Sequence, residues 1–177
     1  MANFNLFIST ILKHEGGFVD DPLDRGGATN KGITMKTFQD TAQSILGIAP
    51  TLENLKNLTD AQAGEIYKAR YWDKIKGDDI ELQDLANIMF DFAVNSGPGR
   101  AAKYLQSILQ DMGENISVDG AIGPNTLNAL SRVDSVEVYR QYKQRRIEFY
   151  HKIVENNPSQ ERFLKGWLNR INSFPDL

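Results

Sequence analysis

Cysteine is absent from the 177 residues of the chain. A disulfide framework, a thiol nucleophile and a thiolate metal site are therefore excluded. Histidine occurs only as His14 and His151. Glu148 and His151 have the spacing of one half of a bundle di-metal motif, but the chain contains no second Glu-x-x-His. The sequence thus predicts no metal site.

Long apolar runs are also missing, because no stretch approaches the roughly 20 residues that a membrane-spanning helix needs. The N-terminal segment MANFNLFISTILKHEGG lacks the early basic region and the small-residue cleavage site of a signal peptide. We therefore expect synthesis in the cytoplasm and no stable membrane insertion. Such a protein acts outside the cytoplasm only after export or release.

Neither sign of charge dominates, since 20 basic and 23 acidic side chains give a formal net charge of -3. This balance argues against bulk nucleic-acid binding. Residues 132–177 are nevertheless slightly basic and include the cluster RQYKQRR at 140–146. We interpret this cluster as a solvated helix face, because Glu137 and Glu148 flank it. A helical nucleic-acid-binding protein is a weaker alternative, and it would show salt-dependent DNA binding.

The composition is that of a folded protein, with 41% hydrophobic and 10% aromatic residues. Apolar residues recur at helical spacing along most of the chain and predict an all-α fold of about seven helices, with at most a short hairpin in residues 18–34. Thr59 and Gln62 form a capping-box pattern that opens a helix through about Trp72. The most apolar stripe, Leu82–Asn95, predicts a helix through the centre of the core.

The stretch HEGGFVDDPLDRGGATNKGIT, residues 14–34, interrupts this pattern with acids and turn residues. Glu15 ends the first apolar helix, and the two glycines after it let a ligand approach the backbone closely. A carboxyl at the C-terminal end of a helix meets the negative end of the helix dipole, and apolar shielding also favours its neutral form. A general acid that works near pH 7 needs this form.

Asp24 follows Glu15 by nine residues, in a loop that Pro22 and the Gly26-Gly27 pair can turn back toward Glu15. Two facing carboxyls in different environments can cleave a glycosidic bond. One protonates the leaving oxygen, while the other serves a water or the developing oxocarbenium ion. The Thr29 hydroxyl is suited to hold that water. The ordinary interpretation is a set of turn and helix-capping residues, because Asp, Gly and Pro are common in both.

The string EGGFVDDPLDRGGATNKGIT resembles the signature of glycoside hydrolase family 108, the EGG-motif muramidases of phages and bacteria. The resemblance continues in YKARYWDKI, in IMFDFAVNSGPGRAAKYLQ and in VDGAIGPNTLNAL, and covers about residues 5–170. The last string is similar to a peptidoglycan-binding-type segment. The resemblance implies a lysozyme-like helical fold, with a catalytic part at residues 1–95 and a peptidoglycan-binding-type part at residues 96–177, packed together as one compact unit.

The resemblance also implies roles for single residues. Glu15 matches the essential glutamate of the family and is the expected general acid. Glu15, Asp24 and Thr29 are similar to the Glu, Asp and Thr set of phage-type lysozymes, with one fewer residue before the threonine. That difference leaves Asn30 open as the third group. Thr34 is a weaker candidate in the same loop, for substrate binding.

Further substrate-binding candidates lie outside this loop. Tyr71 and Trp72 either anchor the core or offer aromatic faces to sugar rings, and the resemblance favours one of the pair at the cleft. Asn95 either caps its helix or offers its amide to the substrate, and the AVNSG string favours the second role. The loop VDGAIGP, residues 118–124, either contacts glycan or is only architectural.

The sequence therefore predicts an N-acetylmuramidase that cleaves the β-1,4 bond between N-acetylmuramic acid and N-acetylglucosamine in peptidoglycan glycan strands. It needs no cofactor, because proton transfer and electrostatics suffice for acetal hydrolysis. Some family members are described as secretion activators or prophage lysins. The alternative is a non-catalytic peptidoglycan-binding or secretion-assisting module, which would bind sacculi without releasing reducing ends. Either protein is expected to act at the cell wall or in the periplasm.

Overall fold

The structure, a computed structural model, describes residues 1–24 and 26–177. The described residues form nine α-helices, several short 3-10 or π-helical segments and one two-stranded antiparallel hairpin. The predicted all-α fold with at most a short hairpin is therefore confirmed. In this described part of the chain, no helix has both the length and the apolar character that a bilayer crossing requires.

Two compact units make up the chain, and each is described by itself. The N-terminal unit is Asn3–Asp73, and the C-terminal unit is Lys74–Leu177 together with Met1–Ala2. The division predicted from the sequence, at residues 95 and 96, stays a prediction.

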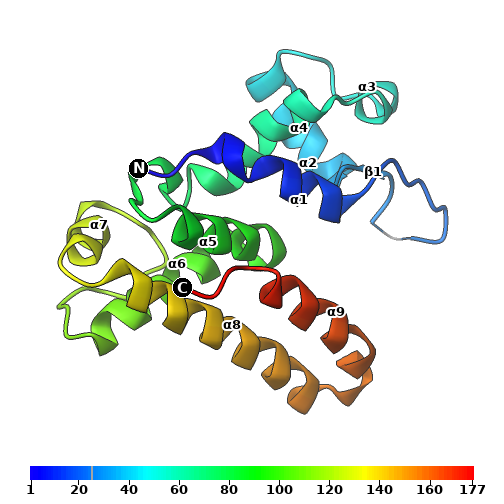
Figure 1. Cartoon of the computed structure of the whole chain (residues 1–177). Helices are drawn as coiled ribbons and strands as arrows, with labels where there is room; N and C mark the ends of the chain where they lie inside the picture. The colour runs from blue at the N-terminus through cyan, green and yellow to red at the C-terminus, as the bar shows by residue number, and fades with distance from the viewer. Residues whose placement is uncertain (25) are drawn as a thin grey trace. The chain divides into compact units, whose positions relative to one another are not determined.

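Short elements dominate the N-terminal unit (Figure 1). They are η1 (Phe4–Leu6), α1 (Ile8–Glu15), β1 (Thr29–Asn30), β2 (Ile33–Thr34), α2 (Met35–Thr41), η2 (Ala42–Leu46), α3 (Leu52–Lys56), α4 (Asp60–Tyr67) and η3 (Lys68–Trp72).

Local sequence signals explain most of these boundaries. Helix α1 ends at Glu15 because Gly16 follows with a φ of 78°, in the left-handed region that favours glycine. Helix α4 begins with the predicted capping box, in which Thr59 and Gln62 each bond the backbone N–H of the other. Helix α2 begins at Met35, after the Thr34 cap, and continues through the π-helical η2.

The hairpin is the part of the N-terminal unit nearest in sequence to the acidic loop. Asn30 pairs with Ile33, so the hairpin loop consists of Lys31 and Gly32 alone. Both residues have positive φ, 52° and 76°, as the common two-residue hairpin loops require. A further bridge pairs Val19 with Thr29, and this bridge brings the two ends of the acidic loop together.

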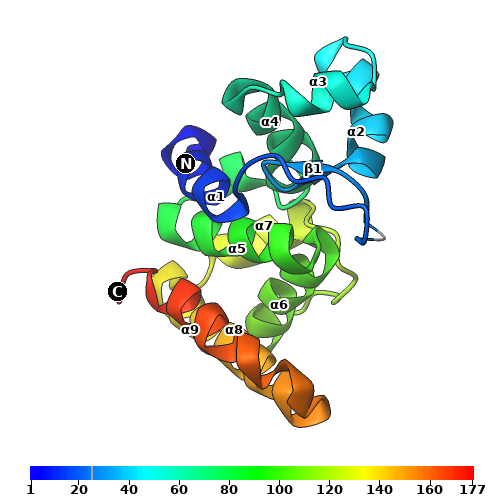
Figure 2. The ribbon, with the colours of Figure 1, turned by 90° about the vertical axis from the view of Figure 1, so that its right-hand side faces the viewer.

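Longer helices make up the C-terminal unit. They are η4 (Gly77–Asp79), α5 (Gln83–Ser96), α6 (Pro98–Asp111), α7 (Pro124–Ser131), α8 (Ser135–Asn156), η5 (Pro158–Gln160) and α9 (Glu161–Asn172). Helices α8 and α9 lie side by side in both views and are joined through η5 (Figures 1 and 2).

Helix α5 lies at the centre of this unit's core, since every residue from Leu85 to Ala93 is buried. The Phe92 ring lies 5.0 Å from Tyr104 of α6, 6.2 Å from Tyr142 of α8 and 5.3 Å from Phe149 of α8, centroid to centroid. Aromatic pairs at such distances add to the stability that area burial provides.

A buried charge network joins three of these helices. Asp91 of α5 pairs with Arg146 of α8 at 2.9 Å and with Arg170 of α9 at 2.7 Å. Arg146 is fully buried and also donates to the Ile88 carbonyl and the Tyr150 hydroxyl. The interpretation of the basic cluster as a solvated face is therefore wrong for Arg146, whose charge is neutralised inside the core.

Candidate active site

Glu15 is half-buried at the end of α1, and its side chain lies against the hairpin turn of the same unit. A Cβ atom placed on Gly32 would lie 2.7 Å from Glu15 Oε2 and 2.8 Å from Glu15 Cβ, and would also collide with the Tyr67 hydroxyl. Carbon contacts this short are not tolerated, so only glycine at position 32 leaves room for both side chains. The acid is thus held between α1 and the hairpin.

Tyr67 fixes the other side of this turn. It is the last residue of α4, it is buried, and its hydroxyl donates to the Lys31 carbonyl at 2.7 Å. Its ring lies 5.7 Å from the ring of Tyr71, one helical turn later. The sequence analysis missed both Gly32 and Tyr67 as site residues. The signal for Gly32 was the Lys-Gly pair of a two-residue hairpin loop, whereas no local signal marks Tyr67.

Asp24 is exposed in the acidic loop. Its Oδ1 accepts the Gly26 N–H at 2.8 Å, and its own N–H donates to the Asp21 carbonyl at 2.9 Å. One carboxylate oxygen therefore stabilises a local turn, and Oδ2 makes no hydrogen bond to the described residues. The loop returns to the hairpin through the two Val19–Thr29 backbone bonds, each 2.8 Å long.

Thr29, Asn30 and Thr34, the polar site candidates of the hairpin, differ in the hydrogen bonds that their side chains make. Thr29 is half-buried, and its hydroxyl has no hydrogen-bond partner among the described residues. Asn30 is buried and donates its amide to the Leu55 and Lys56 carbonyls, at 2.8 and 3.1 Å, so it joins the hairpin to α3. The Thr34 hydroxyl accepts the Thr37 N–H at 3.2 Å and caps α2. Of the three, Thr29 alone keeps a hydroxyl available for water.

Tyr71 and Trp72, the two aromatic candidates, differ in how far they are buried. Trp72 is fully buried and packs edge-on to Phe4, with 5.7 Å between ring centroids. A buried indole offers no surface to a ligand, so only Tyr71 keeps an exposed part. Asn95 belongs to the C-terminal unit, is exposed at the end of α5, and its amide lies 3.4 Å from Asp91 Oδ2. That long contact leaves most of its hydrogen-bonding capacity unused.

The VDGAIGP loop, by contrast, is organised from inside by Gln106 of α6, which the sequence analysis did not single out. The Gln106 amide donates to Asp119 Oδ1 at 2.8 Å and to the Ala121 carbonyl at 3.0 Å, and its oxygen accepts the Gly120 N–H at 2.9 Å. The backbone bond from Ala121, followed by the Gln106 bond, lowers the pKa of Asp119. These contacts give the loop an architectural role.

Across residues 1–24 and 26–177, no three or more His, Asp or Glu side chains gather where they could share an ion.

Two sequence models of known families match the chain in succession. The sequence model of glycosyl hydrolase 108 matches residues 8–97, and that of a predicted peptidoglycan domain matches residues 100–172. Among solved structures, that of SagA from Brucella abortus is similar, with 32% identity and a TM-score of 0.74, covering 97% of this chain and 90% of that one. No curated protein matches the sequence.

These matches support a peptidoglycan-related, lysozyme-like function that includes binding to peptidoglycan. The first of them covers about half of the chain and contains Glu15, Asp24 and the whole hairpin. The likeness to SagA extends over nearly the full length at an identity that exceeds fold similarity alone. The chain is a member of glycosyl hydrolase family 108, with a peptidoglycan-type domain after the family segment.

Proposed function

We propose that the protein is an N-acetylmuramidase, which hydrolyses the β-1,4 bond between N-acetylmuramic acid and N-acetylglucosamine in peptidoglycan strands. The observation that carries the proposal is the position of Glu15, half-buried at the end of α1 against the Gly32 turn, inside the segment that matches the glycosyl hydrolase family. The place of action that follows is the cell wall, after export or release from the cytoplasm.

Glu15 acts as the general acid in this reaction. Cleavage of the glycosidic C–O bond leaves an alkoxide unless a proton reaches the bridging oxygen as the bond breaks. The fixed packing of Glu15 against the turn supports this role, because a proton donor must be held in place at the bond. If the configuration is retained, the carboxylate formed takes its proton back from the water that adds to the sugar; if it is inverted, Asp24 takes that proton and Glu15 is reprotonated from solvent.

Asp24 and Thr29 serve the opposite face of the sugar ring. Asp24 Oδ2 is available to stabilise positive charge at the anomeric carbon or to accept a proton from water. The Thr29 hydroxyl is available to orient that water, since it bonds nothing else among the described residues. Within the N-terminal unit, Tyr71 supplies a contact to a sugar ring, and Thr34 has a lesser part because it caps α2. Asn95, in the C-terminal unit, stays a predicted substrate-binding residue.

The decisive test is Glu15→Gln, which keeps the shape of the side chain and removes the proton. We expect it to fold normally and to lose clearing of purified cell wall by at least about a hundredfold. The matched control is Glu65→Gln, an exposed carboxyl of α4 in the same unit, which should clear wall like the parent protein. Clearing that survives in the Glu15 variant would refute the assignment.

The products distinguish an enzyme from a non-catalytic binding module. Mass spectrometry of released muropeptides should find N-acetylmuramic acid at the new reducing ends. A protein that binds sacculi but releases no reducing ends would instead be a binding or secretion-assisting module. NMR of the first anomer formed would then show whether Asp24 acts as a nucleophile, with retention, or as a base, with inversion.

A further inference from the structure

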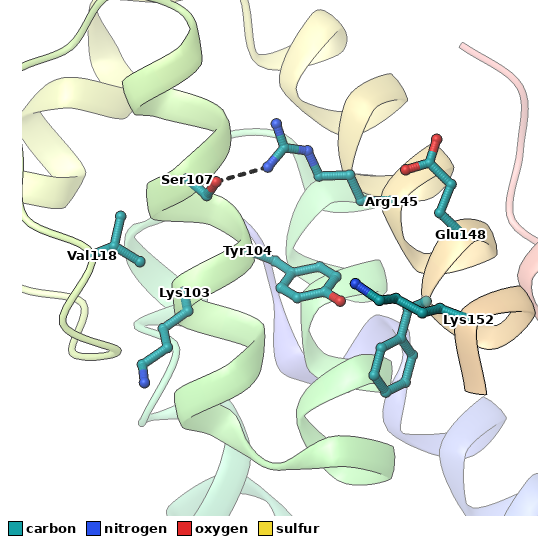
Figure 3. A pocket seen from close by; sticks show the side chains of 8 residues that line it. Lys103, Tyr104, Ser107, Val118, Arg145, Glu148 and Lys152 are labelled. Atoms are coloured by element: carbon teal, nitrogen blue, oxygen red, sulfur yellow. Dashed lines mark hydrogen bonds between the residues drawn. The ribbon is translucent and has the colours of Figure 1, made fainter. Parts of the chain in front are cut away.

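A groove between α6 and α8 lies within the C-terminal unit. Its volume is about 550 Å³, within the usual range of ligand pockets. We call it the α6–α8 groove and define it by Lys103, Tyr104, Arg145, Glu148, Phe149 and Lys152. Figure 3 shows the Tyr104 ring pointing from α6 toward α8, which carries Arg145 and Lys152, and Lys103 beside it on α6 with its ammonium directed away from the ring.

Cations outnumber anions on its walls. The lining contains three basic residues, Lys103, Arg145 and Lys152, and a single acidic residue, Glu148. Lys103 and Lys152 are exposed and have no ion-pair partner in the described chain, whereas Arg145 is paired with Asp111 and bonds Ser107 at 2.9 Å. Two ammonium groups with no carboxylate partner thus border one groove, which makes it attractive to an anion.

The groove also offers a hydroxyl that can donate a hydrogen bond to a ligand. The Tyr104 hydroxyl has no partner among the described residues, and burial raises the pKa of this phenol against the smaller opposite effects of Arg100 and Arg145. It therefore stays a proton donor at neutral pH. A sugar hydroxyl can accept from such a donor, but a carboxylate accepts more strongly because it is charged, and it is also attracted to the ammonium groups.

Its floor is aromatic. The rings of Tyr104 and Phe149 meet edge to face, with 6.1 Å between centroids, and Val118 adds an exposed apolar side chain at the rim. A ligand that fits combines small apolar groups with carboxylates along a short chain. The stem peptide of peptidoglycan has this composition, since it contains both alanine methyls and free carboxylates.

We propose that the α6–α8 groove binds the carboxylates of the peptidoglycan stem peptide. This inference rests on the peptidoglycan substrate of the proposed function, and it assigns to the C-terminal unit recognition of the peptide, separate from cleavage of the glycan. Nucleic acid fits less well, because strong binding needs many phosphates along a continuous basic track. Here Glu148 and Asp111 interrupt the track.

The test compares two double variants of equal charge change in the full-length protein. Lys103→Glu with Lys152→Glu reverses both groove ammonium groups. Lys74→Glu with Lys165→Glu reverses two exposed lysines of the same unit that lie outside the groove. Binding is measured by sedimentation at low salt with intact sacculi and with glycan strands from which an amidase has removed the stem peptides.

We expect the groove variant to lose at least about tenfold in affinity for intact sacculi and the control variant to lose little. Neither variant should change binding to stripped strands. Tyr104→Phe, which keeps the ring, should show a smaller loss on intact sacculi alone. Circular dichroism checks that each variant is folded.

Three results would overturn the inference. They are equal losses in both double variants, equal affinity of the parent protein for stripped and intact wall, and tighter binding of a DNA oligonucleotide than of sacculi. Failure of the muramidase proposal is distinguishable, because all of these measurements are made in the Glu15→Gln background and do not depend on hydrolysis. If the parent protein hydrolyses cell wall but the two double variants bind sacculi equally, the muramidase proposal stands and the groove proposal falls.

Discussion

Gly32 has both a positive φ and no space for a side chain. Its φ of 76° is strained for any other residue, and a Cβ there would strike Glu15 and Tyr67. We expect Gly32→Ala to lower stability by about 1–3 kcal/mol through backbone strain. We also expect wall clearing to fall by about a hundredfold, because Glu15 must move to make room. Thermal unfolding and turbidity assays measure the two effects.

Gly47 provides the matched control for this substitution. It has a φ of 66° in the same unit, but no atom lies within 4 Å of an added Cβ. Gly47→Ala should therefore cost similar stability and leave the activity of the folded protein intact. Equal activity in the two alanine variants would mean that Gly32 does not hold Glu15 in place.

The residues of the candidate site could be predicted only in part from the sequence. Glu15, Asp24 and Thr29 lie in one short motif, so spacing and family likeness were enough to select them. The contact of Gly32 with Tyr67 joins a hairpin to a later helix, and no local pattern encodes it. The sequence could not tell whether Tyr71 or Trp72 is buried. Trp72 is buried because it packs against Phe4, and spacing along the chain does not reveal this contact.

Among the elements, Asp91 carries the strongest link between helices α5, α8 and α9. Asp91→Asn would leave Arg146 charged and fully buried without its carboxylate. Breaking a buried ion pair in this way costs about 3–5 kcal/mol. Asp111→Asn is the control, since its pair with Arg145 is largely exposed and should contribute less than about 1 kcal/mol. Urea denaturation compares the two, and similar losses would contradict a structural role for the network.

Buried tyrosines of α8 bond neighbouring segments. Because their pKa values are raised, we expect the protein to lose stability at high pH. Burial raises the pKa of Tyr139 to about 12 and also raises that of Tyr142, whose hydroxyl donates to the Ala101 carbonyl at 2.9 Å. Above about pH 10 the unfolded chain releases these protons while the native protein keeps them. The free energy of unfolding must therefore fall as pH rises through that range.

Tyr142→Phe isolates this effect. The variant should be less stable at pH 8 by about 1 kcal/mol, because the bond to Ala101 is lost. Its stability should then fall less steeply than that of the parent between pH 10 and 11, since one titrating group has gone. Lysines titrate equally in both proteins, so parallel curves in urea denaturation would argue against the raised pKa.

Element boundaries were predictable where the signal is local. The Thr59 capping box and the stop after Glu15 both match the structure. Helix α3 was missed because five residues make too few turns to show a period. The buried state of Arg146 was missed because its partner Asp91 lies on another helix, and an arginine in a basic run is ordinarily solvated.

At the scale of the whole molecule, the family match and the contacts divide the chain at different places. The glycosyl hydrolase match ends at residue 97, whereas the compact N-terminal unit ends at Asp73. Helix α5 falls between these limits. It belongs by sequence to the hydrolase segment and by packing to the C-terminal unit, where Phe92 contacts α6 and α8. A boundary in a family match is therefore not a folding boundary here.

This difference predicts that residues 1–97 do not form a stable protein alone. Removing residues 98–177 takes away the ring partners of Phe92 and both arginines that neutralise Asp91. Exposing a large buried apolar side chain costs about 1.5–3 kcal/mol. The free-energy cost of exposing α5 and leaving Asp91 unpaired therefore approaches 5–15 kcal/mol, the usual free energy of unfolding of a whole protein. We expect the fragment to aggregate or to lack a cooperative thermal transition, whereas the full chain melts cooperatively. A monomeric 1–97 fragment with a sharp transition would show that α5 is stable without the C-terminal helices.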